Sequence, residues 1–407
     1  MLAPFRPKQT TLTLALIALG LGNHQAPAIA QGTPAAQGDT SLSTVTVIGD
    51  AEQRDGYRAT STRIGKVLQD PHDVAQAVTT VSRSLMDDQA VGSLREALKN
   101  VSGLTFNAAE GGRSGDNMML RGFYTFGDMY LDGIRDTAQY NRETYNLEQV
   151  DVLRGAAAML FGRGQAGGVI NQVTKTAFMD NKSSMTTALG TDNHLEFKGD
   201  FNRTLGESSA IRVNVMNRDE GSWRSNPSDG AEPEVHRTGL AASLAWGIYT
   251  DHQFTLNTSR LETRDNPDYG ISFDSSTKRP TKTFPVDYFW GTQNTFDDST
   301  TQITTLAHQF KLSDVTRLNT QIRTADYDRA YWAQAPSSSS PPSGDGSAGS
   351  AKTRKASTTN HTLQSDLSTR LFTGRVGHEI LAGLEYLRED SRRWSLSDLL
   401  SGNGAAY

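Results

Sequence analysis

The second half of the chain alternates apolar and polar residues with the two-residue period of β-strands. This alternation forms nine segments, at about 183–190, 194–205, 209–219, 235–249, 252–264, 299–312, 315–331, 357–372 and 376–391. In the eighth segment, Leu363 and Leu367 alternate with Gln364 and Asp366. One face of such strands suits lipid and the other suits a wet interior. The pattern therefore predicts the antiparallel strands of a transmembrane β-barrel.

The connections between these segments alternate in length. They are tight near 206–208, 250–251, 313–314 and 373–375, and long at 220–234, 265–298, 332–356 and after 391. Outer-membrane barrels have short periplasmic turns and long outer loops, so the alternation agrees with the predicted barrel. The connection near 191–193 departs from the rule, because its place in the order makes it extracellular although it is short.

Residues 56–178 mix short strands with helices. The segments 84–89 and 93–100 have the composition of helices, and the second begins with a capping box of Ser93 and Glu96. Apolar residues recur on one face of that second helix, as they do on helices that pack against a core. The pattern predicts a compact α/β domain in front of the strands.

The first thirty residues have the pattern of a secretory signal peptide. Arg6 and Lys8 precede an apolar run at 12–21, and Ala28 and Ala30 supply the small residues that a signal peptidase reads. A membrane anchor is the alternative, but the run is about half as long as a bilayer requires. We expect cleavage after Ala30.

The segment after the signal, residues 31–55, is predicted to be a tether that contains one β-prone stretch. Residues 31–40 are mostly small or polar, as in flexible linkers. The β-prone residues that follow are Thr44, Val45, Thr46, Val47 and Ile48. Such a stretch can add as a strand to a sheet edge of another protein, or it can be the first strand of the next domain.

Composition and charge exclude several classes of function. The chain has 407 residues, no cysteine, 21% charged residues and a net charge of −5, so it has no thiolate metal site and no global field that attracts nucleic acid. The eight histidines lack metal-ligand spacing, and Asp87-Asp88 and Asp297-Asp298 are typical of solvated turns. Residues 162–167 match the letters of a dinucleotide-binding loop but not its context. We expect no enzyme activity.

Several glycine-containing motifs in the α/β domain resemble a known family. They are Leu120-Arg121-Gly122, MYLDG at 129–133, NLEQVDVLRG at 146–155 and LFGRGQAGGVIN at 160–171. In this order they are similar to the plug domain of TonB-dependent outer-membrane receptors. Within that family, YNRETYN at 140–146 and DNPDYG at 265–270 resemble the catecholate siderophore receptors.

The resemblance implies a fold and a domain order. An α/β plug domain is followed by an antiparallel transmembrane β-barrel, which in the family has about 22 strands and encloses the plug; about nine strands are expected here. The expected parts are a signal peptide at 1–30, a tether with the TonB box at 31–55, the plug at 56–178 and the N-terminal part of the barrel at 179–407. Thirteen further strands would take roughly 300 more residues, so this chain is expected to stop within an outer loop.

The resemblance also implies a function in the outer membrane. The protein would take up a ferric siderophore of catecholate type, powered by a TonB-type protein in the periplasm that captures residues 44–48. Iron would arrive inside the siderophore, without a resident cofactor or direct protein ligand. Lipid and the barrel-assembly machinery would be further partners, and nucleic acid would not. The alternatives are a receptor for haem or cobalamin, a signalling receptor, which needs a further folded domain before the TonB box, and a non-functional truncated fragment.

Two groups of residues are candidates for specific roles. Arginine and aromatic side chains suit a bulky anion with aromatic faces, and the candidates for ligand contact are Arg113, Tyr140, Arg142, Trp223, Trp290 and Trp332. The tryptophans could instead belong to the aromatic girdle of the barrel. The second group is a predicted lock between plug and barrel, in which Arg121 or Arg154 pairs with Glu385, since a buried arginine requires a carboxylate partner.

Overall fold

The computed structural model describes residues 57, 59, 61–66, 68–106, 116–125, 127–162, 166–274 and 276–394. The predicted signal peptide, the TonB box at 44–48 and Arg113 lie outside the described residues. Among the described residues, no helix is long and apolar enough to cross a membrane.

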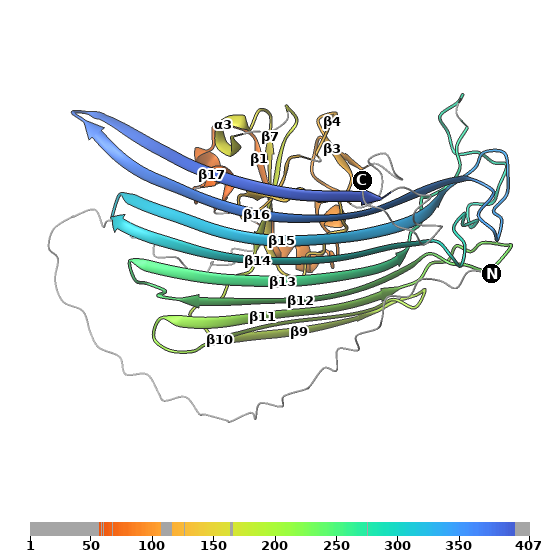
Figure 1. Cartoon of the computed structure of the whole chain (residues 1–407), viewed down its shortest axis with the longest axis horizontal. Helices are drawn as coiled ribbons and strands as arrows, with labels where there is room; N and C mark the ends of the chain where they lie inside the picture. Colours follow the sequence, from red (N-terminus) through yellow and green to blue (C-terminus); the bar gives the residue numbers. More distant parts are fainter. Residues whose placement is uncertain are drawn as a thin grey trace, which may run out of the picture. The chain divides into compact units, whose positions relative to one another are not determined.

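Within the described part of the chain, nine long strands form one antiparallel sheet, which we call the wall. Each strand pairs with the next along the chain, from β9 to β17, and Figure 1 shows them side by side in this order. The strands are β9 (Lys182–Leu189), β10 (Leu195–Thr204), β11 (Ser209–Glu220), β12 (Glu234–Trp246), β13 (His252–Asn266), β14 (Phe296–Ser313), β15 (Thr316–Ala335), β16 (Ser350–Thr373) and β17 (Val376–Trp394). The nine strands predicted from the sequence are confirmed.

The predicted alternation of connection lengths is also present. Residues 221–233, 267–295 and 336–349 form long loops at one end of the wall, whereas 314–315 and 374–375 are tight turns at the other. The main difference from the prediction is β16, which begins at Ser350 and not near 357. Its first residues are polar and carry no alternation, but they pair with β15 as far as Ala335. Pairing with β15 extends this strand beyond its apolar pattern, so the apolar pattern does not reveal where it begins.

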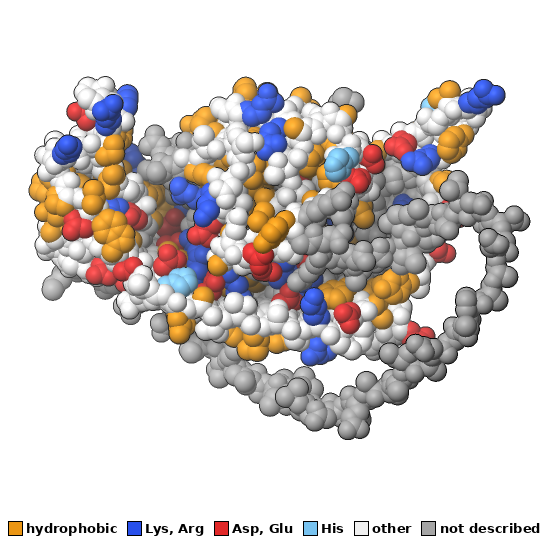
Figure 2. All heavy atoms as spheres, turned by 180° about the vertical axis from the view of Figure 1, so that it is seen from behind, with side chains coloured by type: hydrophobic (Ala, Val, Ile, Leu, Met, Phe, Trp, Pro, Cys, Tyr) orange, Lys and Arg blue, Asp and Glu red, His pale blue; other side chains and the backbone are white. Residues whose placement is uncertain are grey.

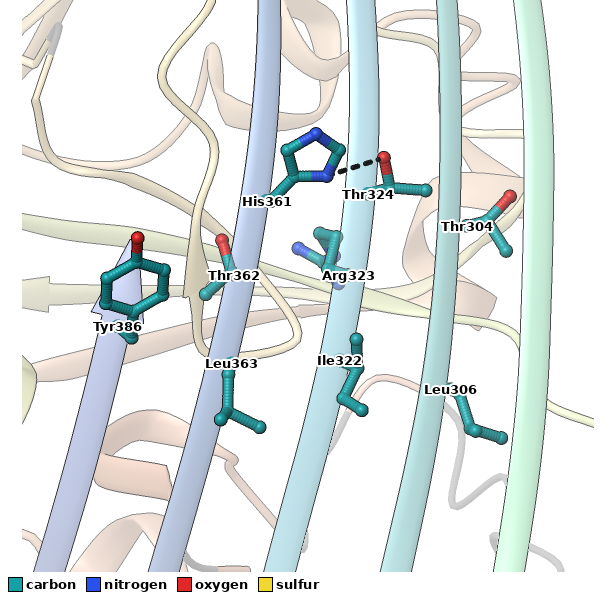
Figure 3. Close-up of a pocket in the computed structure, with 9 residues that line it drawn as sticks. All are labelled: Thr304, Leu306, Ile322, Arg323, Thr324, His361, Thr362, Leu363 and Tyr386. Atoms are coloured by element: carbon teal, nitrogen blue, oxygen red, sulfur yellow. Dashed lines mark hydrogen bonds between the residues drawn. The ribbon is translucent and has the colours of Figure 1, made fainter. Parts of the chain in front are cut away.

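The two faces of the wall differ as the alternation predicts. Leu306, Ile322, Leu363 and Tyr386 lie in register on four adjoining strands, and between 39% and 63% of each side chain is exposed. Figure 3 shows this row lining a shallow depression of about 320 Å³ on the outer face. Arg323, the next residue after Ile322, is 4% exposed and belongs to the opposite, inner face.

The residues before the wall form the plug, which contains two small sheets. One sheet has the order β1-β7-β8-β5-β6 and the other the order β2-β3-β4. The strands are β1 (Val78–Ser82), β2 (Leu104–Phe106), β3 (Met118–Leu120), β4 (Phe123–Tyr124), β5 (Met129–Leu131), β6 (Ile134–Arg135), β7 (Leu147–Arg154) and β8 (Gly168–Thr174). The helical elements are η1 (Ile64–Lys66), η2 (Pro71–Asp73), α1 (Arg83–Asp88), α2 (Leu94–Leu98) and α3 (Ala158–Phe161).

Local signals in the sequence explain the two helices α1 and α2. The Ser82 side chain caps α1, and Ser93 and Glu96 form the predicted capping box at the start of α2. The apolar face of α2, with Leu94 and Leu98 fully buried, packs into the main hydrophobic cluster of the plug. That cluster continues into inward-facing wall residues such as Tyr327, so plug and wall share one core.

Candidate functional site

The predicted ligand contacts Tyr140 and Arg142 are buried in the plug. Tyr140 is 6% exposed and Arg142 is 3% exposed. The Arg142 Nε donates to Asp136 at 2.8 Å, and its guanidinium carbon lies 4.0 Å from the centre of the Tyr140 ring. An Nη atom of Arg142 also lies 3.5 Å from Asp116. The expectation of an open, ligand-facing pair therefore differs from the structure, in which the protein itself satisfies both side chains.

The Asp136 carboxylate joins this cluster to the wall. It accepts hydrogen bonds from Tyr140 at 3.0 Å and from Tyr327 of β15 at 2.9 Å. Burial raises the pKa of the neighbouring Asp116 carboxyl, and the Arg142 guanidinium counteracts part of that rise. Arg142 thus provides positive charge for two buried carboxylates, which makes it part of the structure of the plug.

A second cluster centres on Glu143, the residue after Arg142. Its carboxylate accepts a hydrogen bond from Arg218 of β11 at 3.0 Å and another from Arg237 of β12. Burial raises the pKa of the Glu143 carboxyl, and the two guanidinium groups counteract this. Arg237 also bonds Asp265 of β13 at 2.7 Å. One plug carboxylate therefore holds two strands of the wall.

Two further ion pairs join the plug to the wall, and in both the wall supplies the cation. Arg212 lies 3.3 Å from Glu148 and Arg323 lies 3.6 Å from Asp132. Figure 2 shows basic and acidic side chains next to each other on the face turned away from the viewer in Figure 1. In each of these pairs the wall supplies the cation and the plug the carboxylate. The pair of Lys66 and Asp366, at 3.2 Å, has the opposite arrangement.

Neutral groups of the plug also bind wall arginines. The carbonyl oxygen of Gln139 accepts from Arg329 and its side-chain oxygen accepts from Arg354, both at 3.1 Å. Asn360 of β16 donates to the Thr137 hydroxyl at 2.7 Å. Thr137 and Gln139, which precede the predicted ligand contact Tyr140, therefore bind the wall.

The structure does not bring Arg121, Arg154 and Glu385 together. Arg154 donates to the carbonyl oxygen of Ser102 at 3.0 Å and to the Thr79 hydroxyl at 2.8 Å, which both belong to the plug. The Arg121 residue is exposed and has a positive φ of 53°. Glu385 lies on the inner face of β17, opposite Gln364. The lock expected from the sequence assumed buried arginines, and neither arginine is deeply buried, so neither needs a wall carboxylate.

The three tryptophans occupy different environments. Trp223 lies in the loop between β11 and β12 and is 62% exposed. Trp290 is 2% exposed and packs edge-on against Phe284 and Tyr288. Trp332 lies on the outer face of β15, opposite Phe296. Of the three, Trp223 alone is freely presented to the outside, while Trp290 supports the loop cluster and Trp332 has the position of a girdle residue.

The outer loops bind one another through polar groups. Arg224 donates to the carbonyl oxygen of Gly270, at 2.9 Å, and also bonds Asp268 and the Tyr288 carbonyl oxygen. Asn226 donates to the Gly291 carbonyl oxygen at 2.7 Å and to that of Ser343 at 3.3 Å. Three loops far apart in sequence are thus held in one layer. Among the described residues, no group of three or more metal-binding side chains occurs.

Sequence reasoning missed the wall arginines and the plug carboxylates that bind them. The two-residue alternation of the strands could have indicated Arg218 and Arg323. It places both of them on the inner face of the wall. Glu143, Glu148 and Asp132 carry no comparable signal, since their neighbours alternate with no fixed period.

The described residues form a plug of two small sheets that ion pairs fasten to a wall of long antiparallel strands, which is the arrangement found in plugged barrels. Residues 70–169 match the family model described as TonB-dependent Receptor Plug Domain, and this part of the chain is a plug of that family. The chain is 27% identical to the catecholate siderophore receptor Fiu of Escherichia coli K12, over 89% of this chain and 50% of that protein. It is 30% identical to the probable TonB-dependent siderophore receptor PiuA of Acinetobacter baumannii, over 84% of this chain and 47% of that protein.

Solved structures agree with this assignment. The closed form of the ferric-catecholate import receptor Fiu from E. coli K12 superposes with a TM-score of 0.74 and 27% identity, covering 83% of this chain and 50% of that one. The chain spans about half the length of the curated relatives it matches. The predicted resemblance and the predicted order of plug and barrel strands are confirmed, and the relatives are receptors, not enzymes.

Proposed function

We propose that this chain supplies the plug and nine wall strands of an outer-membrane receptor that imports a ferric siderophore with energy from TonB. The observation that carries the proposal is that the likeness to a catecholate siderophore receptor runs through the plug and the wall together, over 89% of this chain. A plug match alone would support only the family. The pairs that fasten the plug, such as Glu143 with Arg218, are ion pairs.

The proposed cargo is a ferric catecholate, which is a bulky anion with aromatic faces. Trp223 is exposed in an outer loop and suits stacking on such a ligand. Arg113, which lies outside the described residues, is proposed to contribute positive charge. Tyr140 and Arg142 are proposed to support the apex from below, because their own side chains are buried.

The remaining parts of the proposal concern export and energy coupling. Residues 1–30 direct export and are removed after Ala30, and residues 31–55 carry the TonB box at 44–48, which a TonB-type protein captures by strand addition. Residues 56–178 form the plug, and residues 179–407 enter the outer membrane with the help of the barrel-assembly machinery and pack against its lipid.

The experiment is a ligand comparison in an iron-starved host that lacks catecholate receptors of its own. The receptor that contains this chain is expressed there, and the cells are supplied with iron-55 as a ferric tris-catecholate, a ferric trihydroxamate or haem. We expect saturable binding of the catecholate at 0 °C and growth on it as the iron source. Binding and growth on haem or the hydroxamate alone would contradict the catecholate assignment, and growth on none of the three would contradict siderophore uptake.

A further inference from the structure

The buried arginines on the inner face of the wall fall into two classes, which differ in where their countercharge lies. Three have a carboxylate partner on a neighbouring wall strand: Arg212 bonds Asp200 at 2.8 Å, Arg237 bonds Asp265 at 2.7 Å and Arg329 bonds Asp297 at 2.6 Å. These pairs lie within the wall and do not depend on the plug. Their charge remains neutralised wherever the plug is.

Arg218, which bonds Glu143 at 3.0 Å, and Arg323 of β15 belong to the other class, because their carboxylate partners lie in the plug. Arg323 has Asp132 of the plug as its carboxylate partner, with an Nη atom 3.6 Å from the carboxylate oxygen. Its other two contacts are neutral, a bond from Nε to the Thr305 hydroxyl at 2.8 Å and a bond from Nη1 to the carbonyl oxygen of Leu131 at 2.9 Å. Its direct neighbours across the strands are Thr305 and Thr362. The wall therefore offers Arg323 no carboxylate at these positions.

The contact between Arg323 and Asp132 is incomplete. The Arg323 Nη2 atom is buried and makes no hydrogen bond, while the residue as a whole is 4% exposed. Asp132 is already bonded by Thr174, through the backbone N–H and the hydroxyl, both at 2.9 Å. The carboxylate therefore has its own partners in the plug and can leave Arg323 without losing them.

The surroundings of Arg323 suit an anion. It lines a small space of about 20 Å³ between plug and wall, and Asp132, Lys175, Asn214 and Asn257 line it as well. The side-chain amide nitrogen of Asn214 is buried there without a hydrogen-bond partner. An unused donor thus faces this space, where the low dielectric makes a charge-assisted hydrogen bond strong. Lys175 is already paired with Asp200 at 2.9 Å.

We propose that Arg323 is an anion-binding station on the wall, which the plug covers at rest and which receives the anionic ferric siderophore when the plug moves. The inference rests on the proposed function and adds to it a site and a chemical class of ligand. Moving Asp132 away would leave a buried guanidinium without a countercharge, which is costly. An anionic siderophore that enters after the plug has moved replaces the Asp132 carboxylate beside Arg323. Binding at this position therefore favours anionic ligands.

The test changes the countercharge and leaves the arginine in place. Thr305→Asp puts a permanent carboxylate on the wall directly across from Arg323, and Thr305→Asn is the neutral control of similar shape. We expect Thr305→Asp to lower the maximal rate of energised uptake of iron-55 catecholate about tenfold, the factor of one charge-assisted hydrogen bond. Binding at 0 °C in de-energised cells should be unchanged, and Thr305→Asn should transport like the parent.

A second pair of variants removes the arginine itself. Arg323→Gln should lower the maximal uptake rate to a similar extent, and Arg323→Lys, which keeps the charge, should restore most of it. Arg317→Gln, on the same strand and face but at an exposed position, should have the smaller effect. A uniform loss of binding and heat stability in Arg323→Gln would indicate a purely structural role and overturn the proposal. So would parental rates in both Thr305→Asp and Arg323→Gln.

The failure of this inference is distinguishable from failure of the proposed function. If the parent receptor does not accumulate the ferric catecholate, the proposed function fails. If the parent accumulates it, and Thr305→Asp and Arg323→Gln accumulate it at the parental rate, Arg323 does not bind the siderophore during transport. The proposed function then stands.

Discussion

The phenol ring of Tyr145 in the plug lies directly against Gly239 of strand β12. A Cβ atom at position 239 would stand 2.6 Å from two atoms of the ring. Tyr145 is 5% exposed, and its hydroxyl donates to the carbonyl oxygen of Arg260 at 3.3 Å. The absence of a side chain at 239 is therefore what allows the plug to seat against this part of the wall.

Replacing Gly239 by valine should loosen the seat of the plug. The added side chain must displace the Tyr145 ring, and overpacking of this kind costs about 1–3 kcal/mol. The expected result is a lower unfolding temperature of the purified receptor in detergent, measured by circular dichroism, and greater sensitivity of cells to a large antibiotic.

The control for this prediction is a second substitution that removes the ring with which the valine would clash. The double variant Gly239→Val with Tyr145→Ala should recover stability relative to Gly239→Val, because the cavity left by the ring accepts the valine. Equal stability of Gly239→Val and the parent would show that the ring and the glycine are not in contact.

Glu143→Gln should destabilise the receptor far more than Glu148→Gln. Glu143 is the carboxylate for Arg218 and shares Arg237 with Asp265, so its loss leaves a buried guanidinium without a countercharge, at about 3–5 kcal/mol. Glu148 contacts Arg212, which keeps two bonds to Asp200 at 2.8 Å, and its loss should cost about 1 kcal/mol. Thermal unfolding of the two variants in parallel measures the difference. Similar midpoints would contradict the two-strand role of Glu143.

Lys175→Met should stabilise the receptor at neutral pH. Burial lowers the pKa of Lys175 from 10.5 to about 8, although Asp200 lies 2.9 Å from its Nζ and opposes the shift. A shift of this size corresponds to a cost of about 3 kcal/mol for keeping the folded lysine charged. Methionine avoids that cost, and Asp200 retains Arg212 as its partner.

The stability advantage of Lys175→Met over the parent should depend on pH. Below pH 8 the lysine is protonated in both folded and unfolded states, so the cost is full and constant. Between pH 8 and 10.5 the unfolded state binds more protons, and the stability of the parent therefore rises with pH. The advantage of Lys175→Met should shrink over this range. An exposed control, Lys282→Met, should show no such dependence, and an advantage of Lys175→Met that stays constant to pH 10.5 would refute the cause.

Arg142→Ala should lower stability even in the absence of any ligand. Its ion pairs with Asp136 and Asp116 are buried, and their loss should cost about 3 kcal/mol or more. The exposed loop residue Arg279 provides the control, and Arg279→Ala should be neutral. If Arg142→Ala unfolds like the parent and loses only siderophore binding, the arginine contacts ligand and does not support the plug.

The strands of the wall were predictable because an apolar outer face and a polar inner face require alternating residues along each strand. That requirement fixes every second residue, as in the row of Leu306, Ile322 and Leu363, and a period of two is visible in a single sequence. The capping box of Ser93 and Glu96 was predictable for a similar reason, since both partners lie within one turn of helix.

The contacts between plug and wall were not predictable, because they join residues far apart in the chain. Arg218 and Glu143 are 75 residues apart, and Arg323 and Leu131 are 192 apart. The two-residue alternation shows which face of a strand an arginine occupies, but it does not show which plug residue lies opposite. The sequence indicated Arg142 as a ligand contact, although its charge is buried against Asp116 and Asp136, two carboxylates that the sequence does not mark.

The dependence of uptake on TonB tests the central claim most directly. The initial rate of iron-55 catecholate accumulation is measured in two otherwise identical iron-starved hosts, with and without TonB, that express the receptor containing this chain. The account predicts rapid, saturable accumulation with TonB and only surface binding without it. Equal accumulation in the two hosts, or none in either while the receptor is present in the outer membrane, would contradict it.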